Sequence, residues 1–294
     1  MRFFVLSMLL LFIGINLHAQ TNQPTASQSV EFLPSGTIFE PLTAHQQEPN
    51  VGVRKEIGSS RLKLDIGSTL DFLQVKLNRD STDLLRVGSE LFTYALSTNA
   101  QGLRLQIDAL DGFFGGHIVY RHVAPSYSAS VRLRLMHISA HLIDGHYDMQ
   151  TMSWMDNRLP IPFTRDFGEL TFALRLPLGP FSARFYSGLD YAAHLRPEEI
   201  QRFSSLHGFD ATSGSLLGNV FGKPFEAYLA FNLNLTGIPT YVGSSVTEAG
   251  VKFGQWDGPG IKFFVNYATG MEFFSEYYNV RRNKAGLGFS FDFW

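Results

Sequence analysis

The chain has 294 residues, 45% of them hydrophobic, and a formal net charge of −2. This charge gives no reason to expect nucleic acid as a partner, because nucleic-acid-binding surfaces are strongly basic. The chain contains no cysteine, so disulfide bonds and a lipid attached to an N-terminal cysteine are both excluded. Hydrogen bonds and packing must therefore hold the fold together, and no sequence feature identifies a cofactor.

The N-terminus predicts a secretory signal peptide. Arg2 provides the positive charge, residues 3–15 form an almost unbroken apolar run, and Ala19 ends a plausible cleavage region. The run is short for a helix that spans a bilayer. We therefore interpret residues 1–19 as a cleaved signal rather than as a retained anchor.

From Leu62 onward, apolar and polar residues alternate with a period of two, which is typical of β-strands. The clearest case runs from Phe225 to Leu235. The alternation slips by one residue at Leu73, which predicts a β-bulge. After the signal, no apolar run reaches the roughly 18 residues of a spanning helix, so strands are expected to carry the hydrophobic residues.

These patterns predict an all-β fold, a transmembrane antiparallel up-and-down β-barrel of about 12 strands. Residues 61–294 are assigned to the barrel and residues 20–60 to an N-terminal segment on the periplasmic side. The long connections 142–166 and 194–224 are expected on the outer side. The strands are predicted at 61–77, 83–96, 102–110, 114–123, 127–141, 167–176, 181–193, 225–236, 240–254, 260–268, 271–278 and 284–294.

A soluble β-sandwich or lipocalin-like barrel is the alternative, but its polar face would be rich in Lys and Glu. Here the polar positions carry Gly, Ser and Asn with balanced Arg and acidic residues, which favours a salt-bridged barrel interior in the bacterial outer membrane. Phe289, Phe291 and Phe293 alternate with polar residues before Trp294. This end resembles the aromatic C-terminal strand that the barrel-assembly machinery recognises, although Phe293 rather than Trp294 shares the apolar face.

One predicted strand carries candidate catalytic residues. Arg132 and Arg134 must face the interior, because charge is costly in lipid. The alternation then places His137, Ser139 and His141 on the lipid-facing side, toward the outer end of the strand. A serine needs a neighbouring base to act as a nucleophile, and residues two apart on a strand are separated by about 6–7 Å.

A third group should orient the histidine. Glu169 falls on the interior face, which leaves Asp144, Asp148 and Asn157 in the following connection. A metal shared by the two histidines is not expected, because positions 137 and 141 are about 13 Å apart on an extended strand. The trio could instead form rim contacts with lipopolysaccharide head groups or neighbouring loops.

The His137-x-Ser139 pair resembles that of outer-membrane phospholipase A and of the lipid A deacylase barrels. The resemblance implies a serine-dependent lipid acyl hydrolase with Ser139 as nucleophile and His137, or alternatively His141, as base; we add Asp144 as the third member. Those families follow the serine with Asn and usually Gly, whereas this chain continues Ala-His-Leu.

A second resemblance covers most of the chain and is carried by residues 32–41, by Glu48-Pro49 and by the run 137–144. These segments are similar to an uncharacterised family of bacterial outer-membrane barrels, known by a domain-of-unknown-function label. That family implies an envelope barrel without a stated activity.

The sequence as a whole leaves three functional hypotheses. They are a lipid esterase acting on phospholipid or lipopolysaccharide acyl chains, a non-enzymatic envelope barrel that contacts these lipids, and a narrow solute channel.

Overall fold

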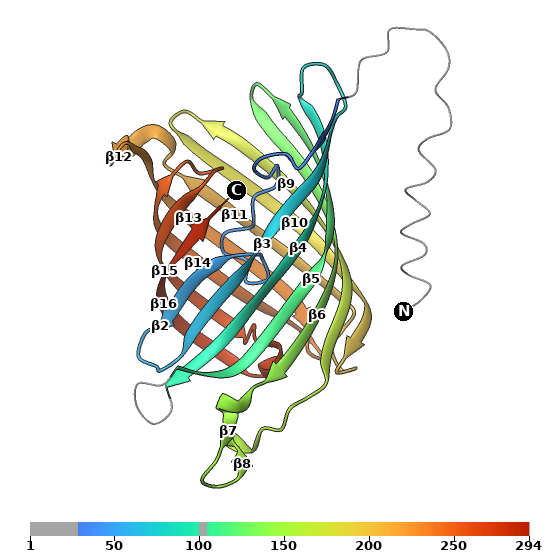
Figure 1. The fold of residues 1–294 in the computed structure, drawn as a ribbon, viewed down its shortest axis with the longest axis vertical. Helices are drawn as coiled ribbons and strands as arrows, with labels where there is room; N and C mark the ends of the chain where they lie inside the picture. The colour runs from blue at the N-terminus through green and yellow to red at the C-terminus, as the bar shows by residue number, and fades with distance from the viewer. Residues whose placement is uncertain (1–28, 100–104, 294) are drawn as a thin grey trace.

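The computed structural model describes residues 29–99 and 105–293 (Figure 1). The predicted signal peptide and Trp294 lie outside them. The strands are β1 (Val30–Phe32), β2 (Val51–Glu56), β3 (Leu62–Lys76), β4 (Asp83–Asn99), β5 (Leu105–Ala124), β6 (Tyr127–Leu142), β7 (Tyr147–Asp148), β8 (Ser153–Trp154), β9 (Phe163–Leu178), β10 (Phe181–Arg196), β11 (Phe203–Thr212), β12 (Asn219–Val220), β13 (Lys223–Gly237), β14 (Tyr241–Gly254), β15 (Gly260–Met271) and β16 (Arg281–Asp292). Short 3₁₀ turns are η1 (Asp144–His146), η2 (Met155–Asn157), η3 (Gly214–Leu217) and η4 (Ser275–Tyr277).

Twelve of these strands form a closed antiparallel barrel, which confirms the predicted fold class. The wall contains β2 to β6, β9 to β11 and β13 to β16, and β2 closes it by pairing with both β16 and β3. The predicted β-bulge is also present, as a register shift between Asp71 and Leu73. No helix among residues 29–99 and 105–293 is long and apolar enough to cross a membrane.

Two predicted strand boundaries were wrong. Residues 102–110 and 114–123 were predicted as separate strands, but β5 (Leu105–Ala124) is continuous through the described part of both; residues 102–104 lie outside the described residues. Asp111 faces the lumen and accepts hydrogen bonds from the backbone N and the Oγ of Ser275. Residues 271–278 are not a strand, because β15 ends at Met271 and the chain then turns into the barrel mouth.

Two barrel strands were missed. β2 lies within residues 20–60, so the barrel begins earlier than predicted, and its six residues are too few for a convincing alternation. β11 carries Ser205 and His207 on its outer face between Phe203 and Phe209, which hides the apolar pattern. The predicted total was right because these two omissions balanced the two incorrect assignments.

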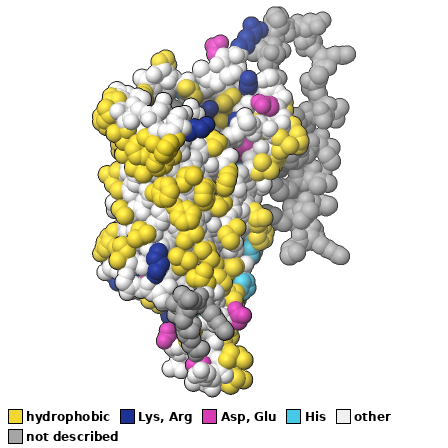
Figure 2. Space-filling view, turned by 60° about the vertical axis from the view of Figure 1, so that its left-hand side comes forward, with side chains coloured by type: hydrophobic (Ala, Val, Ile, Leu, Met, Phe, Trp, Pro, Cys, Tyr) yellow, Lys and Arg dark blue, Asp and Glu magenta, His cyan; other side chains and the backbone are white. Residues whose placement is uncertain are grey.

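The two faces of the wall differ in polarity. On β6, Leu133 and Leu135 are 41% and 55% exposed on the outside, whereas Arg132 and Arg134 are 3% and 1% exposed inside. Hydrophobic side chains cover the middle of the outer surface, and most charged side chains on the face shown lie near its ends (Figure 2). An apolar exterior around an ion-paired interior is the pattern of a membrane-spanning barrel.

The connections fall at two ends of the barrel. The terminal end, at the top of Figure 1, holds the end of β16 and the connection 213–222 with β12. The loop end, at the bottom, holds the connection 143–162 with β7 and β8. The predicted outer loop 194–224 is therefore wrong, because β11 divides it between the two ends. The turn 238–240 lies at the loop end as well.

The segment before β2 fills the terminal half of the lumen. We call residues 33–50 the plug; in Figure 1 they run inside the barrel. Ile38, Phe39, Leu42 and Ala44 are each at most 4% exposed. The prediction placed this part of the chain on the periplasmic side, separate from the barrel. The correction follows from its buried apolar residues, which pack inside the wall rather than against lipid.

Ion pairs and hydrogen bonds fasten the plug to the wall. Glu48 forms two hydrogen bonds with the guanidinium of Arg132, at 2.9 and 2.5 Å. Arg134 donates to the carbonyl oxygen of Gln47 at 3.2 Å. On the opposite side, Arg184 donates to the carbonyl oxygen of Glu40 at 2.7 Å. Buried charges need such partners, so the plug and the wall each supply partners for the buried polar groups of the other.

The connection 272–280, which contains η4, folds into the loop end of the lumen. Phe274 and Tyr277 are buried against the inner wall. The hydroxyl of Tyr94 donates to the carbonyl oxygen of Phe273 at 3.0 Å, and the hydroxyl of Tyr277 donates to Asp108 at 2.5 Å. The lumen is therefore occupied from both ends.

Candidate functional site

The predicted orientation of the candidate strand agrees with the structure. On β6, Arg132 and Arg134 point inward and are buried, whereas Ser139 and His141 lie on the outer face with His137. These three residues lie near the loop end of β6, directly before the long connection 143–162.

The outer wall becomes polar around these residues. On the inner face of the same part of β6, the side chains of Met136 and Ile138 are at most 4% exposed. The paired part of β9 shows the same inversion, with Phe163 and Phe167 buried and Asp166 outside. The lipid-facing side of β6 is therefore apolar from Leu135 toward the terminal end and polar from His137 toward the loop end, as expected where a barrel wall reaches the head-group region.

A carboxylate on the neighbouring strand holds His137. His137 of β6 lies opposite Asp166 of β9, and its Nδ1 is 2.6 Å from Oδ1 of Asp166. With Nδ1–H donating to the carboxylate, Nε2 carries a free lone pair and can accept a proton. This is the arrangement in which an acidic group fixes the tautomer and orientation of a catalytic base.

Two further side chains restrict this pair. The ring of His137 lies against Phe114 of β5, with ring centroids 4.7 Å apart. The second oxygen of Asp166 is 3.1 Å from Nδ1 of His194 on β10. Asp166 thus joins histidines from the strands on both sides of β9, and both of its oxygens have partners.

Ser139 lies two residues beyond His137 on the same face. Opposite it on β5 is Gly112, and a Cβ atom at that position would lie 3.9 Å from Oγ of Ser139, so the glycine leaves the hydroxyl open on that side. The structure shows no hydrogen bond between Ser139 and His137.

The other predicted members are arranged differently. His141 lies on the exposed outer face, but no carboxylate contacts it among the described residues. Asp144 begins η1, and within residues 29–99 and 105–293 no hydrogen bond or ion pair links it to the three β6 residues. Asp148 binds the backbone N of Gln150. Neither Asp148 nor Asn157 contacts His137 among the described residues, whereas Asp166 does.

A second serine–histidine pair also faces outward. Oγ of Ser187 on β10 is 2.9 Å from Nδ1 of His207 on β11, and Nε2 of His207 is 3.2 Å from Oγ of Ser205. Both ring nitrogens thus contact hydroxyl groups, and no carboxylate contacts His207 among the described residues. The pair lacks an orienting acid and provides a natural comparison for Ser139.

The rim beside Asp166 is hollowed. Thr164, Asp166, His194 and Arg202 line the hollow with the aromatic residues Tyr191, Phe203 and Tyr241. The guanidinium of Arg202 donates to the carbonyl oxygens of Ala192 and Ala193 at 2.9 and 2.5 Å. No carboxylate pairs with Arg202 in the described part of the chain. The described residues contain no group of three or more His, Cys, Asp or Glu arranged to hold a metal ion.

The closed barrel, its apolar exterior and its ion-paired lumen define an outer-membrane β-barrel protein. No protein-family model matches the chain, and no curated protein matches it.

Solved structures with similar folds include outer membrane phospholipase A from Escherichia coli, at 11% identity over 85% of this chain and 95% of that chain, with a TM-score of 0.49. They also include in-vitro folded OmpT of Vibrio cholerae in its trimer form, at 7% identity over 82% and 99% of the two chains, with a TM-score of 0.38. Outer-membrane expressed OmpT of Vibrio cholerae has 7% identity over 84% and 98% and a TM-score of 0.33. These likenesses concern the fold.

Proposed function

We propose that this protein is a lipid-facing serine acyl hydrolase, with Ser139 as nucleophile, His137 as general base and Asp166 as the residue that orients His137. The observation that carries the proposal is the 2.6 Å contact between His137 and Asp166 on the outer face of the wall, two residues from Ser139. Asp166 also selects the base, since it contacts His137 and not His141.

The proposed reaction is ester hydrolysis through an acyl-enzyme. Oγ of Ser139 attacks the carbonyl carbon of a lipid ester while its proton moves to Nε2 of His137. The ester C–O bond then breaks, and the leaving alcohol takes the proton from His137. A water, activated by the same histidine, releases the fatty acid and restores Ser139. Asp166 stabilises the imidazolium that forms in each half of the reaction.

The surroundings support an acyl lipid of the outer leaflet as substrate. On the terminal-end side of the site, toward the middle of the barrel wall, the outward residues Leu133, Leu135 and Leu170 are exposed and apolar, which suits acyl chains. Beside it, the rim hollow presents Arg202 without a carboxylate partner among the described residues, which suits a phosphorylated head group of a phospholipid or of lipopolysaccharide.

Two other hypotheses fit less well. A solute channel would need a continuous lumen, whereas the plug and the connection 272–280 occupy this one from both ends. A purely structural barrel has no need for a carboxylate that contacts the histidine of a lipid-facing His-x-Ser pair.

The outward phenyl rings of Phe289, Phe291 and Phe293 on and after β16 support recognition by the barrel-assembly machinery during insertion.

The proposal is tested by incubating the detergent-refolded protein with phospholipid and, separately, with lipid A, and measuring released fatty acid. We expect release from at least one substrate, and loss of that release in Ser139→Ala with unchanged heat-modifiable gel mobility. No release from either substrate, or release that persists in Ser139→Ala, contradicts the proposal.

A further inference from the structure

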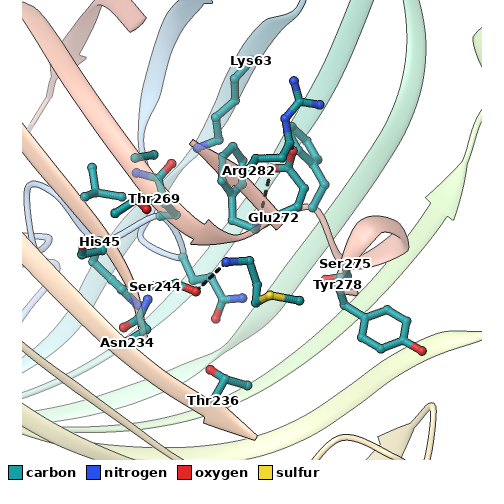
Figure 3. A pocket seen from close by; sticks show the side chains of 18 of the residues that line it. His45, Lys63, Asn234, Thr236, Ser244, Thr269, Glu272, Ser275, Tyr278 and Arg282 are labelled. Atoms are coloured by element: carbon teal, nitrogen blue, oxygen red, sulfur yellow. Dashed lines mark hydrogen bonds and ion pairs between the residues drawn. The ribbon is translucent and has the colours of Figure 1, made fainter. Parts of the chain in front are cut away.

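A cavity of about 170 Å³ lies inside the loop half of the barrel (Figure 3). Its floor is formed by His45, Gln46 and Gln47 of the plug, and residues of the connection 272–280 lie over one side. One water occupies about 30 Å³ in the liquid, so this space is large enough for a small organic molecule. The cavity is on the opposite face of the wall from Ser139 and has no part in the proposed hydrolysis.

Most charges around the cavity are already paired. Arg61 binds Glu56 and Glu272 at 3.1 and 2.7 Å, and Arg282 binds the same two carboxylates at 3.1 and 3.5 Å. Lys63 binds Asp65 at 2.5 Å. These pairs present a fixed set of donors and acceptors with little net charge, so they do not by themselves select an ion.

Lys284 is different. It lies on the inner face of β16 and lines the cavity, but among residues 29–99 and 105–293 no carboxylate lies within ion-pair distance of it. It is therefore the cavity lysine that remains available for an anionic group of a ligand.

The adjoining wall offers neutral hydrogen-bonding groups. Asn234 and Thr236 of β13 line the cavity and make no side-chain hydrogen bond with any other described residue. Asn266 of β15 is 7% exposed, and its Oδ1 has no partner within the described part of the chain. A buried amide oxygen without a partner is costly, so a donor from a ligand or from water belongs at this position. Phe163 and Phe273 supply apolar surface nearby.

We propose that this cavity is a binding site for a small acidic sugar. Its hydroxyl groups would bond to Asn234, Thr236 and Asn266, and its acidic group would lie near Lys284. The presence of both neutral hydrogen-bonding groups and Lys284 indicates the chemical class of the ligand. A simple anion would leave the amides and hydroxyls without partners, and a neutral sugar would leave Lys284 without one. Pockets that select a ligand commonly combine apolar walls with a few placed polar groups of this kind.

Titration calorimetry on the refolded full chain tests the proposal, with glucuronate, glucose and acetate as probes. We expect glucuronate to bind at least tenfold more tightly than glucose or acetate. Lys284→Gln should remove that difference between glucuronate and glucose, whereas Lys223→Gln, an exposed lysine at the terminal end, should leave it intact. Asn234→Leu should weaken both sugars.

Hydrogen exchange on the unmodified protein keeps the proposal testable if a variant fails to fold. Glucuronate should slow exchange at 234–236 and 282–286 and leave 181–188 unchanged. Absence of glucuronate binding, equal binding of acetate or glucose, or full binding by Lys284→Gln would overturn the assignment. Because none of these variants touches the lipid-facing site, fatty-acid release should be unaffected, so the two proposals fail separately.

Discussion

His137 and Asp166 are 29 positions apart in the chain, yet they are direct neighbours on the outer face of the barrel, with Nδ1 and Oδ1 2.6 Å apart. The register of β6 against β9 sets this contact. The contact engages Nδ1 and leaves Nε2 of the imidazole without a hydrogen-bond partner among the described residues, on the outer face that also carries Ser139. If the site is catalytic, removing this contact should lower the rate of fatty-acid release. If these residues only form a polar patch, removing it should have no effect on that rate.

Asp166→Asn should lower kcat for fatty-acid release by about 10⁴-fold, the loss seen when the acid of a serine triad becomes an amide and the histidine tautomer changes. The fold should persist, because Asn keeps the shape of Asp. The matched control is Asp144→Asn, which changes an acid with no contact to the trio and should retain wild-type activity. Equal activity in the two variants would show that Asp166 does not orient the base.

Alanine substitutions of the two histidines of β6 should have different effects on fatty-acid release. His137→Ala should reduce fatty-acid release nearly as much as Ser139→Ala, and the double variant should be no worse, because the two residues act as one unit. His141→Ala should cost far less, since no carboxylate orients His141 in the described structure. A steady-state comparison of the four proteins checks this, and a reversed order would move the base to His141.

The packing of the plug inside the barrel should depend on the negative charge of Glu48. Burial alone would raise the pKa of the Glu48 carboxyl, but Arg132 and Arg134 outweigh burial and hold that pKa well below its ordinary value of 4.5. A depressed pKa stabilises the folded state above the ordinary value, and this stabilisation is lost as the pH falls through the folded-state pKa. Residues 38–48 should thus stay protected from hydrogen exchange from neutral pH to about pH 5 and lose protection only at lower pH.

Glu48→Gln should remove that protection at neutral pH, because it leaves buried guanidinium groups short of a negative partner, at a cost of about 3–5 kcal/mol. Glu198→Gln is the control, since Glu198 forms an exposed pair with Arg196. Protection in Glu48→Gln that matches the wild type would show that the plug is held by its apolar residues alone.

Topology provides an independent check, since barrels carry their longer loops outside and their termini in the periplasm. An epitope inserted at Gln150, in the loop-end connection, should be reached by antibody on intact cells. An epitope at Leu216, in the terminal-end connection, should be reached only after permeabilisation. The opposite result would place His137 and Ser139 at the periplasmic rim.

The barrel could be predicted from the sequence because apolar alternation marks the strands that cross the lipid, as in β13. The same rule failed near the loop end, where the polarity of the wall inverts. Phe163 and Phe167 face inward there, so β9 was taken to start at residue 167, and Asp166 was left in a loop. Thr164, Arg165 and Asp166 form an unbroken polar run between Phe163 and Phe167, so no alternation marked Asp166 as a strand residue.

The plug was missed for a related reason. Residues 33–50 lack a period because they form no regular element, and their burial depends on ion pairs with wall arginines that are far away in the chain. Arg132 and Arg134 were correctly placed inside, but their partners could not be known until the barrel closed around Glu48. Sequence alternation thus located the outward face of the strands that it detected, but it did not reveal the segments that fill the barrel interior.

The most direct test of the central claim is covalent labelling with a lipid-like fluorophosphonate, followed by mass spectrometry of the modified peptides. Ser139 should be labelled, and labelling should fall sharply in His137→Ala and Asp166→Asn. Ser187, which faces lipid beside His207 but has no carboxylate behind that histidine, is the internal control and should remain unmodified. Label on Ser187 at the same level as on Ser139, or on neither serine, would contradict the assignment of Ser139 as an activated nucleophile.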